Sequence, residues 1–189
     1  NRSGIDPQLI DEFILGNVIE PPNASNVGRV IAVKAGIPEK VPAFTVNRNC
    51  ASGMEAVVSG MNRILQGDAQ IVIAGGAESM SSFPVTFPKK MRDFLVSLNK
   101  AKTWQQKLST LFSFRPSFLK PNVPVIADPL CGLSMGQTAE NIAREFHVTR
   151  EEADQFALLS QTRAMNATTN GRLAEEIVPI PIPPKYGKV

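Results

Sequence analysis

Cysteine and histidine are scarce in this sequence, which contains only Cys50, Cys131 and a single histidine, His147. Two cysteines are too few for a disulfide framework and are typical of a protein from a reducing compartment. No apolar run approaches the roughly 20 residues that a membrane-spanning helix needs. We expect no metal site, and we interpret His147, on a polar stretch between two predicted helices, as a surface residue.

The composition is that of a globular protein, with 43% hydrophobic and 20% charged residues in a chain of 189. Such a chain is long enough for one sizeable core and is neither disordered nor fibrous. Its net charge of +3 is unevenly distributed, because residues 89–120 contain eight basic residues and one acid. That segment therefore carries +7 and the remainder −4, so the segment needs its own explanation.

Predicted strands and helices alternate in the first half of the chain. Apolar, partly β-branched runs predict three strands, and apolar residues at helical spacing predict two helices between them. The strands are expected at residues 13–19, 42–46 and 71–74, and the helices at 26–35 and 54–65. This order builds a parallel sheet covered by helices on both faces, so the fold class is α/β.

Cys50 lies between the predicted strand 42–46 and the helix that follows it. It is therefore at or next to a helix N-terminus, where unpaired backbone N–H groups and the positive end of the helix dipole favour a thiolate. This position makes Cys50 a candidate nucleophile, and we expect its helix to be buried. The alternative is a small residue that fills space, because free cysteine is often buried. Position alone leaves both interpretations open.

Three blocks of the sequence resemble thiolases, and they occur in the order of that family. Residues 46–56, VNRNCASGMEA, are similar to its reactive-cysteine motif, and residues 71–81, IVIAGGAESMS, to the strand and turn that follow. Residues 135–141, MGQTAEN, are similar to the segment that returns towards the substrate. The chain is thus identified as a member of the thiolase superfamily. This implies an N-terminal half-domain over residues 1–189, with a mixed sheet flanked by helices.

The resemblance implies a catalytic mechanism centred on Cys50. Thiolases cleave a 3-ketoacyl-CoA with a second CoA, so Cys50 is expected to form the acyl-enzyme, and its backbone N–H to be one oxyanion donor. CoA is then a co-substrate, and no permanently bound cofactor is expected. Met135 matches the methionine that borders the acyl and pantetheine pocket. Ser134 stands where many short-chain biosynthetic thiolases have histidine, which favours longer-chain degradative substrates.

The catalytic unit that the resemblance implies is incomplete in this sequence. The family's Gly-His-Pro, Cys-x-Gly-Gly-Gly and Asn-Glu-Ala-Phe blocks do not occur in residues 1–189, and Cys131 does not match the second catalytic cysteine. The chain also begins at Asn1 without an initiating methionine. We therefore expect an incomplete part of the enzyme that is inactive by itself.

Residues 83–127 interrupt the α/β alternation with basic residues, apolar stripes at helical spacing and several prolines. The pattern predicts two short basic amphipathic helices folded against each other. Either the stripes form only the internal core of an inserted loop, or the basic faces meet anionic lipid, a partner subunit or the phosphates of an acyl carrier. The segment resembles the loop of the thiolase subunit that pairs with a multifunctional fatty-acid-oxidation subunit.

Residues 134–189 return to regular structure. Ser134 and Thr149 are predicted to begin two helices, each with a capping residue three positions later, Gln137 and Glu152. Residues 177–182 alternate like a strand, and their prolines restrict that strand to a sheet edge.

The leading hypothesis is a 3-ketoacyl-CoA thiolase of fatty-acid β-oxidation. It acts on acyl-CoA as a homodimer or larger oligomer, cytoplasmic in a bacterium or mitochondrial in a eukaryote. A multifunctional β-oxidation subunit and a peripheral membrane contact through residues 83–127 are the expected partners, and no nucleic acid is expected. The alternatives are an acetoacetyl-CoA thiolase, a ketosynthase relative, or a non-catalytic module for dimerisation and docking. The Asn-x-x-Cys-x-Ser-Gly context around Cys50 is thiolase-like and disfavours the ketosynthase.

Overall fold

A computed structural model of the chain describes residues 3–82, 84–121 and 127–180. The chain forms two compact units, Asn1–Pro124 and Val125–Val189, and each is described by itself.

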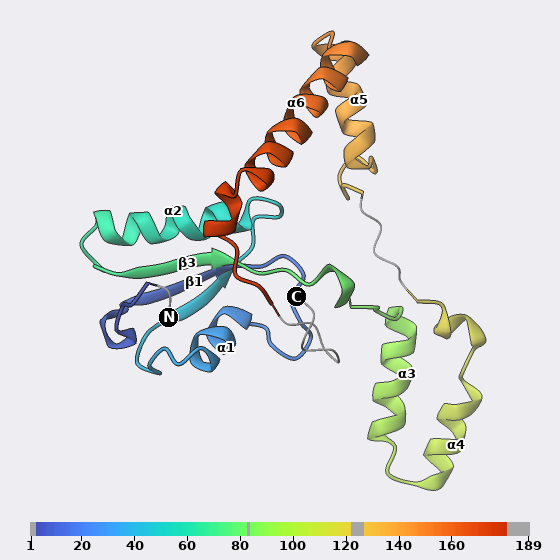
Figure 1. The fold of residues 1–189 in the computed structure, drawn as a ribbon. Helices are drawn as coiled ribbons and strands as arrows, with labels where there is room; N and C mark the ends of the chain where they lie inside the picture. The colour runs from blue at the N-terminus through green and yellow to red at the C-terminus, as the bar shows by residue number, and fades with distance from the viewer. Residues whose placement is uncertain (1–2, 83, 122–126, 181–189) are drawn as a thin grey trace. The chain divides into compact units, whose positions relative to one another are not determined.

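The first unit is built on a parallel sheet, which in the described residues has three strands. They are β1 (Glu12–Gly16), β2 (Ala43–Val46) and β3 (Val72–Gly76), in the order β2-β1-β3. The chain crosses the sheet in opposite directions after β1 and after β2, so right-handed crossovers place the two connecting helices on opposite faces. Figure 1 shows α1 (Val27–Lys34) on one face and α2 (Ser52–Leu65) on the other. The predicted α/β fold is confirmed, but the pairing observed is parallel and not mixed.

The core lies around β1, because the central strand is covered on both faces. All five residues of β1 are buried, and their side chains alternate between the two faces. Ile14 is fully buried, and Glu12 pairs with Arg63 of α2 at 3.1 Å. A hydrophobic cluster of buried residues consists of Ile10, Phe13, Leu15, Ala32, Ile37 and Val41.

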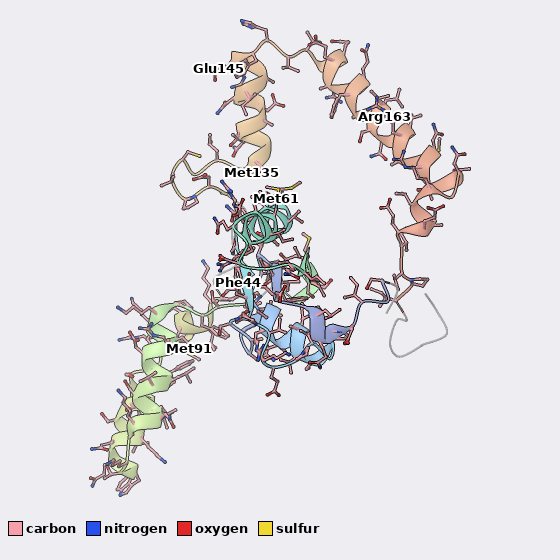
Figure 2. The ribbon with its side chains drawn as sticks, turned by 90° about the vertical axis from the view of Figure 1, so that its left-hand side faces the viewer. Phe44, Met61, Met91, Met135, Glu145 and Arg163 are labelled. Atoms are coloured by element: carbon pink, nitrogen blue, oxygen red, sulfur yellow. The ribbon has the colours of Figure 1, made fainter. Side chains whose placement is uncertain are left out.

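The helix after Cys50 is buried on one face only, whereas we expected a buried helix. Small residues, Ser52, Ala56 and Gly60, pack on the sheet. The opposite face is apolar and exposed, with Met61 (Figure 2) 51% exposed and Leu65 75% exposed. The prediction was wrong for this face because no described part of the chain covers it.

The predicted helical pair in residues 83–127 is present as α3 (Lys89–Lys100) and α4 (Trp104–Phe112). The two helices contact each other and run side by side (Figure 1), and a short 3-10 helix, η3 (Pro116–Leu119), packs against α3. Three rings join these elements: Phe94 lies 5.4 Å from Phe114 and 6.3 Å from Phe118. Residues 83 and 122–126 of the predicted insertion lie outside the described residues.

The second unit contains the two predicted helices, α5 (Met135–Glu145) and α6 (Arg150–Thr169). Both capping boxes are confirmed, with Ser134 accepting from the Gln137 N–H and Thr149 from the Glu152 N–H. Further 3-10 turns are η1 (Pro7–Leu9), η2 (Met80–Ser82) and η4 (Arg172–Glu175).

Three further expectations concern the edge strand, His147 and membrane-spanning helices. The predicted edge strand is wrong for residues 177–180, which form no strand, and residues 181–182 lie outside the described part. His147 is exposed and has φ +55° in the turn between α5 and α6, as expected of a surface residue. Within the described ranges, no helix is long and apolar enough to span a membrane.

Candidate functional site

Cys50 lies in the tight turn that joins β2 to α2. The cap residue of the helix is Ala51, so the cysteine directly precedes the helix N-terminus, as the sequence predicted. Its side chain is exposed and forms no disulfide. The preceding residue, Asn49, has φ +49°, a left-handed conformation that asparagine tolerates better than most residues. The thiol is therefore accessible at a helix end whose backbone conformation is unusual.

Hydrogen bonds among the residues on either side of Cys50 fix the conformation of the turn. The Ser52 hydroxyl accepts from the Arg48 N–H at 2.9 Å and donates to the Asn49 carbonyl at 2.6 Å. The Ser52 N–H also donates to that carbonyl at 3.0 Å. On the outside of the turn, Arg48 forms an ion pair with Glu55 of the first helical turn. The conformation of Asn49 is thus determined by bonds on both of its sides.

Asn47 connects the turn to the end of β1. Its side-chain carbonyl accepts from the Asn49 N–H at 3.0 Å, and its amide donates to the Val18 carbonyl at 3.4 Å. One side chain therefore contacts both the residue before Cys50 and the neighbouring strand's exit.

Glycine permits the helix N-terminus to lie directly on the sheet. A Cβ on Gly16, the last residue of β1, would lie 2.4 Å from the backbone of Ser52. A Cβ on Gly76, at the end of β3, would lie 3.4 Å from the Gly16 carbonyl oxygen and 3.5 Å from Gly53. Gly16 is the position where no other residue fits without displacing the start of α2.

Glu78 and Asn17 join the ends of β1 and β3. The Glu78 carboxylate accepts from the backbone N–H groups of Val18 at 2.8 Å and Ile19 at 3.1 Å. The Asn17 amide donates to the same carboxylate at 3.1 Å and to the Ala77 carbonyl at 2.8 Å. The Asn17 N–H in turn donates to the Val46 carbonyl at the end of β2, at 3.1 Å. These bonds tie the exits of all three described strands together.

The carbonyl oxygen of the Asn17 side chain is buried and has no hydrogen-bond partner among the described residues. Asn17 is only 5% exposed, and its amide faces two acceptors, so the opposite orientation of the side chain would be worse. An unsatisfied buried acceptor costs about 1–3 kcal/mol. The two hydrogen bonds that its amide donates offset this cost.

The other end of the same two strands carries a similar carboxylate. The side chain of Asp11 accepts from the backbone N–H groups of Gln70 at 2.7 Å and Ile71 at 3.0 Å. These two N–H groups, Ile71 foremost, hold the pKa of the Asp11 carboxyl below its ordinary value of 3.8. Asp11 lies at the opposite edge of the sheet from the Cys50 turn.

Ser134 and Met135 belong to the second unit, whereas Cys50 belongs to the first. The Ser134 hydroxyl accepts from the Gln137 N–H at 3.3 Å, and Ser134 donates its own N–H to the Gln137 side chain at 2.9 Å. Met135 is the first residue of α5 and is 58% exposed. Cys131, also exposed, lies in the loop before this helix. Among the described residues, no group of three histidine, cysteine or acidic side chains forms a metal site.

No role was assigned to Asn17, Asn47 or Glu78 from the sequence. In the structure each follows the end of a different strand, although Asn17 lies inside the predicted strand 13–19, and parallel strands bring their carboxyl ends to one edge of a sheet. A polar residue shortly after the end of a strand is the signal that could have identified Asn47 and Glu78, whereas Asn17 required the observed end of β1 at Gly16.

The sequence is also similar to known proteins. Residues 1–189 match the family model "Thiolase, N-terminal domain". The chain is 39% identical over 183 residues to a 3-ketoacyl-CoA thiolase of Aeromonas salmonicida, covering 97% of this chain and 42% of that protein. It is 39% identical over 185 residues to the mitochondrial trifunctional enzyme subunit beta of Mus musculus, covering 98% and 39%. It thus spans about two fifths of the length of these relatives.

Two solved structures are similar in fold. The Bacillus anthracis acetyl-CoA acetyltransferase has a TM-score of 0.73 and 35% identity, and the similarity covers 96% of this chain and 42% of that one. The Acat5 thiolase from Ascaris suum in complex with coenzyme A has a TM-score of 0.74 and 27% identity, with 95% and 42% covered.

Proposed function

The chain belongs to the thiolase family, as its N-terminal domain, and we propose that it is part of a 3-ketoacyl-CoA thiolase of fatty-acid β-oxidation. The observation that carries the proposal is the exposed Cys50 thiol at the start of α2, in a turn held by Ser52 and Asn47. A nucleophile has to be accessible and fixed in orientation, and this turn provides both.

In the proposed reaction the Cys50 thiolate adds to the 3-keto carbon of the substrate. The bond between C2 and C3 then breaks, the acyl chain remains on Cys50, and the enolate of acetyl-CoA takes up a proton and leaves. The thiol of a second CoA attacks the acyl-cysteine, the acyl chain leaves as acyl-CoA, and the Cys50 thiol is restored. The backbone N–H of Cys50 is proposed as one donor to the oxyanion. The base and the acid come from parts of the enzyme that this chain does not contain.

Ser134 and Met135 are proposed to border the acyl and pantetheine pocket. Ser134 already accepts the Gln137 N–H as a helix cap, so its contribution is to hold the start of α5 beside the substrate. CoA is the co-substrate, and we propose no permanently bound cofactor.

The assembly that we propose is a homodimer or larger oligomer. One face of α2 is apolar and exposed, which supports the proposal that another part of the enzyme packs against it. The apolar groove beside it has a volume of about 310 Å³. It is lined by Val57, Gly60, Met61, Ile64, Leu65, Val72 and Ala74. We propose that the enzyme acts in the cytoplasm of a bacterium or in a mitochondrion, and the Mus musculus relative is named as mitochondrial.

The hairpin of α3 and α4 is proposed as the contact to an anionic membrane or to a multifunctional β-oxidation subunit. The rings of Phe94, Phe114 and Phe118 pack against one another inside the hairpin. Two other rings do not belong to this cluster: Trp104 is 72% exposed and Phe112 is 83% exposed. Exposed aromatic rings beside basic side chains are typical of segments that lie at a membrane interface. The basic residues of the hairpin are exposed as well, so their positive charge is available for docking.

The test of the catalytic proposal is thiolysis by the full-length protein and its Cys50→Ala variant. We expect the variant to lose several orders of magnitude in kcat, because the acyl-enzyme cannot form. Mass spectrometry should detect the acyl group on Cys50 of the wild type, and iodoacetamide should label Cys50 faster than Cys131. Thiolysis retained by Cys50→Ala, or acylation at Cys131, would show that the nucleophile is another residue.

The same assay separates the two enzyme candidates. The 35% identity to an acetyl-CoA acetyltransferase favours acetoacetyl-CoA as the alternative substrate. Higher kcat/KM for medium- or long-chain 3-ketoacyl-CoA than for acetoacetyl-CoA is the result expected of the β-oxidation enzyme. The reverse order would identify an acetoacetyl-CoA thiolase, and wild-type protein without any thiolysis would favour the non-catalytic docking module.

The test of docking neutralises the exposed basic residues of the hairpin. The residues to be changed to Gln are Lys89, Lys90, Arg92, Lys100 and Lys102. Each is worth on the order of 1 kcal/mol near an anionic surface, although Arg92 contributes less because it pairs with Asp93 at 2.8 Å. Liposome co-sedimentation and partner pull-down should weaken, and wild-type binding should weaken with salt.

A matched variant exchanges Lys and Arg at the same five positions, which keeps the charge and should keep the binding. Turnover on a short soluble ketoacyl-CoA should be largely retained in both variants. Unchanged association together with lost turnover would assign the basic residues to the CoA phosphates instead.

A further inference from the structure

Glu78 holds a position that the proposed reaction does not account for. Its carboxylate accepts three hydrogen bonds, from the N–H groups of Val18 and Ile19 and from the side chain of Asn17. All three donors belong to the segment that leaves β1. The carboxylate therefore fixes the path of the chain at the edge of the sheet where the Cys50 turn lies.

A continuous path of contacts leads from this carboxylate to the nucleophile. Glu78 binds the Val18 N–H, and the Val18 carbonyl accepts from the Asn47 side chain. The other end of that side chain accepts the N–H of Asn49, whose φ is +49° and which directly precedes Cys50. A movement of Val18 would thus be transmitted through one side chain to the residue that orients the thiol.

Asn17 reinforces this path from the strand side. Its backbone N–H donates to Val46, the last residue before the turn, and its side chain donates to Ala77 and Glu78. Its own buried carbonyl oxygen has no partner among the residues that the structure describes. An apolar residue at position 17 would remove both hydrogen bonds of the amide, and the Ala77 carbonyl and the Glu78 carboxylate would each lose a donor.

From these contacts we infer that Glu78 and Asn17 are positioning residues, which hold the Cys50 turn in the geometry that thiolysis requires. Glu78 acts through Val18 and Asn47, and Asn17 acts through its hydrogen bonds to Val46 and Glu78. The role in thiolysis rests on the proposed function, but the effect on the Cys50 thiol does not. Neither residue takes part in the chemistry itself.

The fold contains a matched control for this inference. Asp11 also accepts two backbone N–H groups across β1 and β3, but at the far end of the same strands. Asp11→Asn and Glu78→Gln therefore make the same chemical change in the same pair of strands. A merely structural role would give both variants the same signature.

The experiment uses the full-length protein and three measurements: iodoacetamide labelling of Cys50 with Cys131 as internal reference, kcat and KM of thiolysis, and urea unfolding. Glu78→Ala should lower kcat about ten- to a hundredfold with KM nearly unchanged, and should change the labelling rate of Cys50 but not of Cys131. Glu78→Gln keeps an acceptor for Ile19 and Asn17 but turns an amide NH2 towards the Val18 N–H, so it should change kcat and Cys50 labelling in the same direction as Glu78→Ala. Asp11→Asn should alter only the unfolding midpoint.

If Glu78→Ala does not fold, Asn47→Ala replaces it, because Asn47 is exposed and its removal breaks the path at one point. The inference is overturned if neither Glu78 variant nor Asn47→Ala changes Cys50 labelling and kcat more than Asp11→Asn does. Failure of the proposed function has a different signature, which is turnover retained by Cys50→Ala or absent from the wild type. The labelling rates test the positioning role in either case.

Discussion

The sheet around Cys50 and the hairpin of α3 and α4 are held together by different means. Backbones approach closely in the sheet, where Ser52, Ala56 and Gly60 are the buried contacts of α2. In the hairpin, three aromatic rings fill the space between the elements, and Phe94 is the only buried residue of α3 and α4.

The difference is informative about function. Small residues and backbone hydrogen bonds leave one arrangement of strand and helix, as a turn that orients a nucleophile requires. Ring contacts at 5.4–6.3 Å maintain two helices as a surface but position no single atom closely. The sheet thus fits the proposed chemistry and the hairpin the proposed docking, and three substitutions test this contrast.

The largest effect is expected from Gly16→Ala, because the new methyl group would lie 2.4 Å from the Ser52 backbone. The start of α2 has to move, which we expect to lower the free energy of unfolding by about 3 kcal/mol and to reduce turnover. Gly76→Ala is the control, since its methyl group would meet atoms at 3.4 Å and should cost less than about 1 kcal/mol. Urea unfolding and thiolysis of both variants are the measurements. Equal costs at the two positions would mean that close approach at Gly16 is not what fixes the helix.

Phe94→Ala should have an effect of nearly this size, but restricted to the hairpin. It removes the ring that contacts both Phe114 and Phe118, at a cost of about 2–3 kcal/mol to the local structure. Hydrogen exchange should increase in residues 89–119 and remain unchanged around Cys50. Phe112→Ala, at a ring that is 83% exposed, should leave both regions unchanged. Faster exchange of the Cys50 turn in Phe94→Ala would show that the two regions are coupled.

The smallest effect, and one that depends on pH, is expected from Asp11→Asn at the far end of the sheet. The folded-state pKa of Asp11 lies below 3.8, so the ionised carboxylate stabilises the fold above that pH, and its contribution is lost as pH falls through the folded-state value. The variant should therefore be less stable than wild type at pH 7, and the difference should shrink below about pH 4. Urea unfolding at several pH values measures it, and a difference that grows in acid would contradict the assignment.

Much of the local structure follows from the sequence alone, since it depends on residues close together in the chain. Apolar spacing predicted α2, α3 and α4, and the pairs Ser134 with Gln137 and Thr149 with Glu152 predicted the starts of α5 and α6. The position of Cys50 directly before a helix was predicted in the same way. A helix cap and the regular spacing of apolar residues each extend over a few residues, so both can be recognised without knowledge of the fold.

Only the tertiary structure decided which distant residues surround that cysteine. Glu78 meets Val18 and Asn17 across about 60 positions, and Gly16 meets Ser52 because the order β2-β1-β3 brings α2 onto β1. Contacts of this kind produce no repeating pattern in the sequence, because they are set by strand pairing and crossover handedness. Residues close together in the chain therefore set the elements and the place of Cys50 at a helix start. The pairing of distant segments determined which polar side chains hold it there.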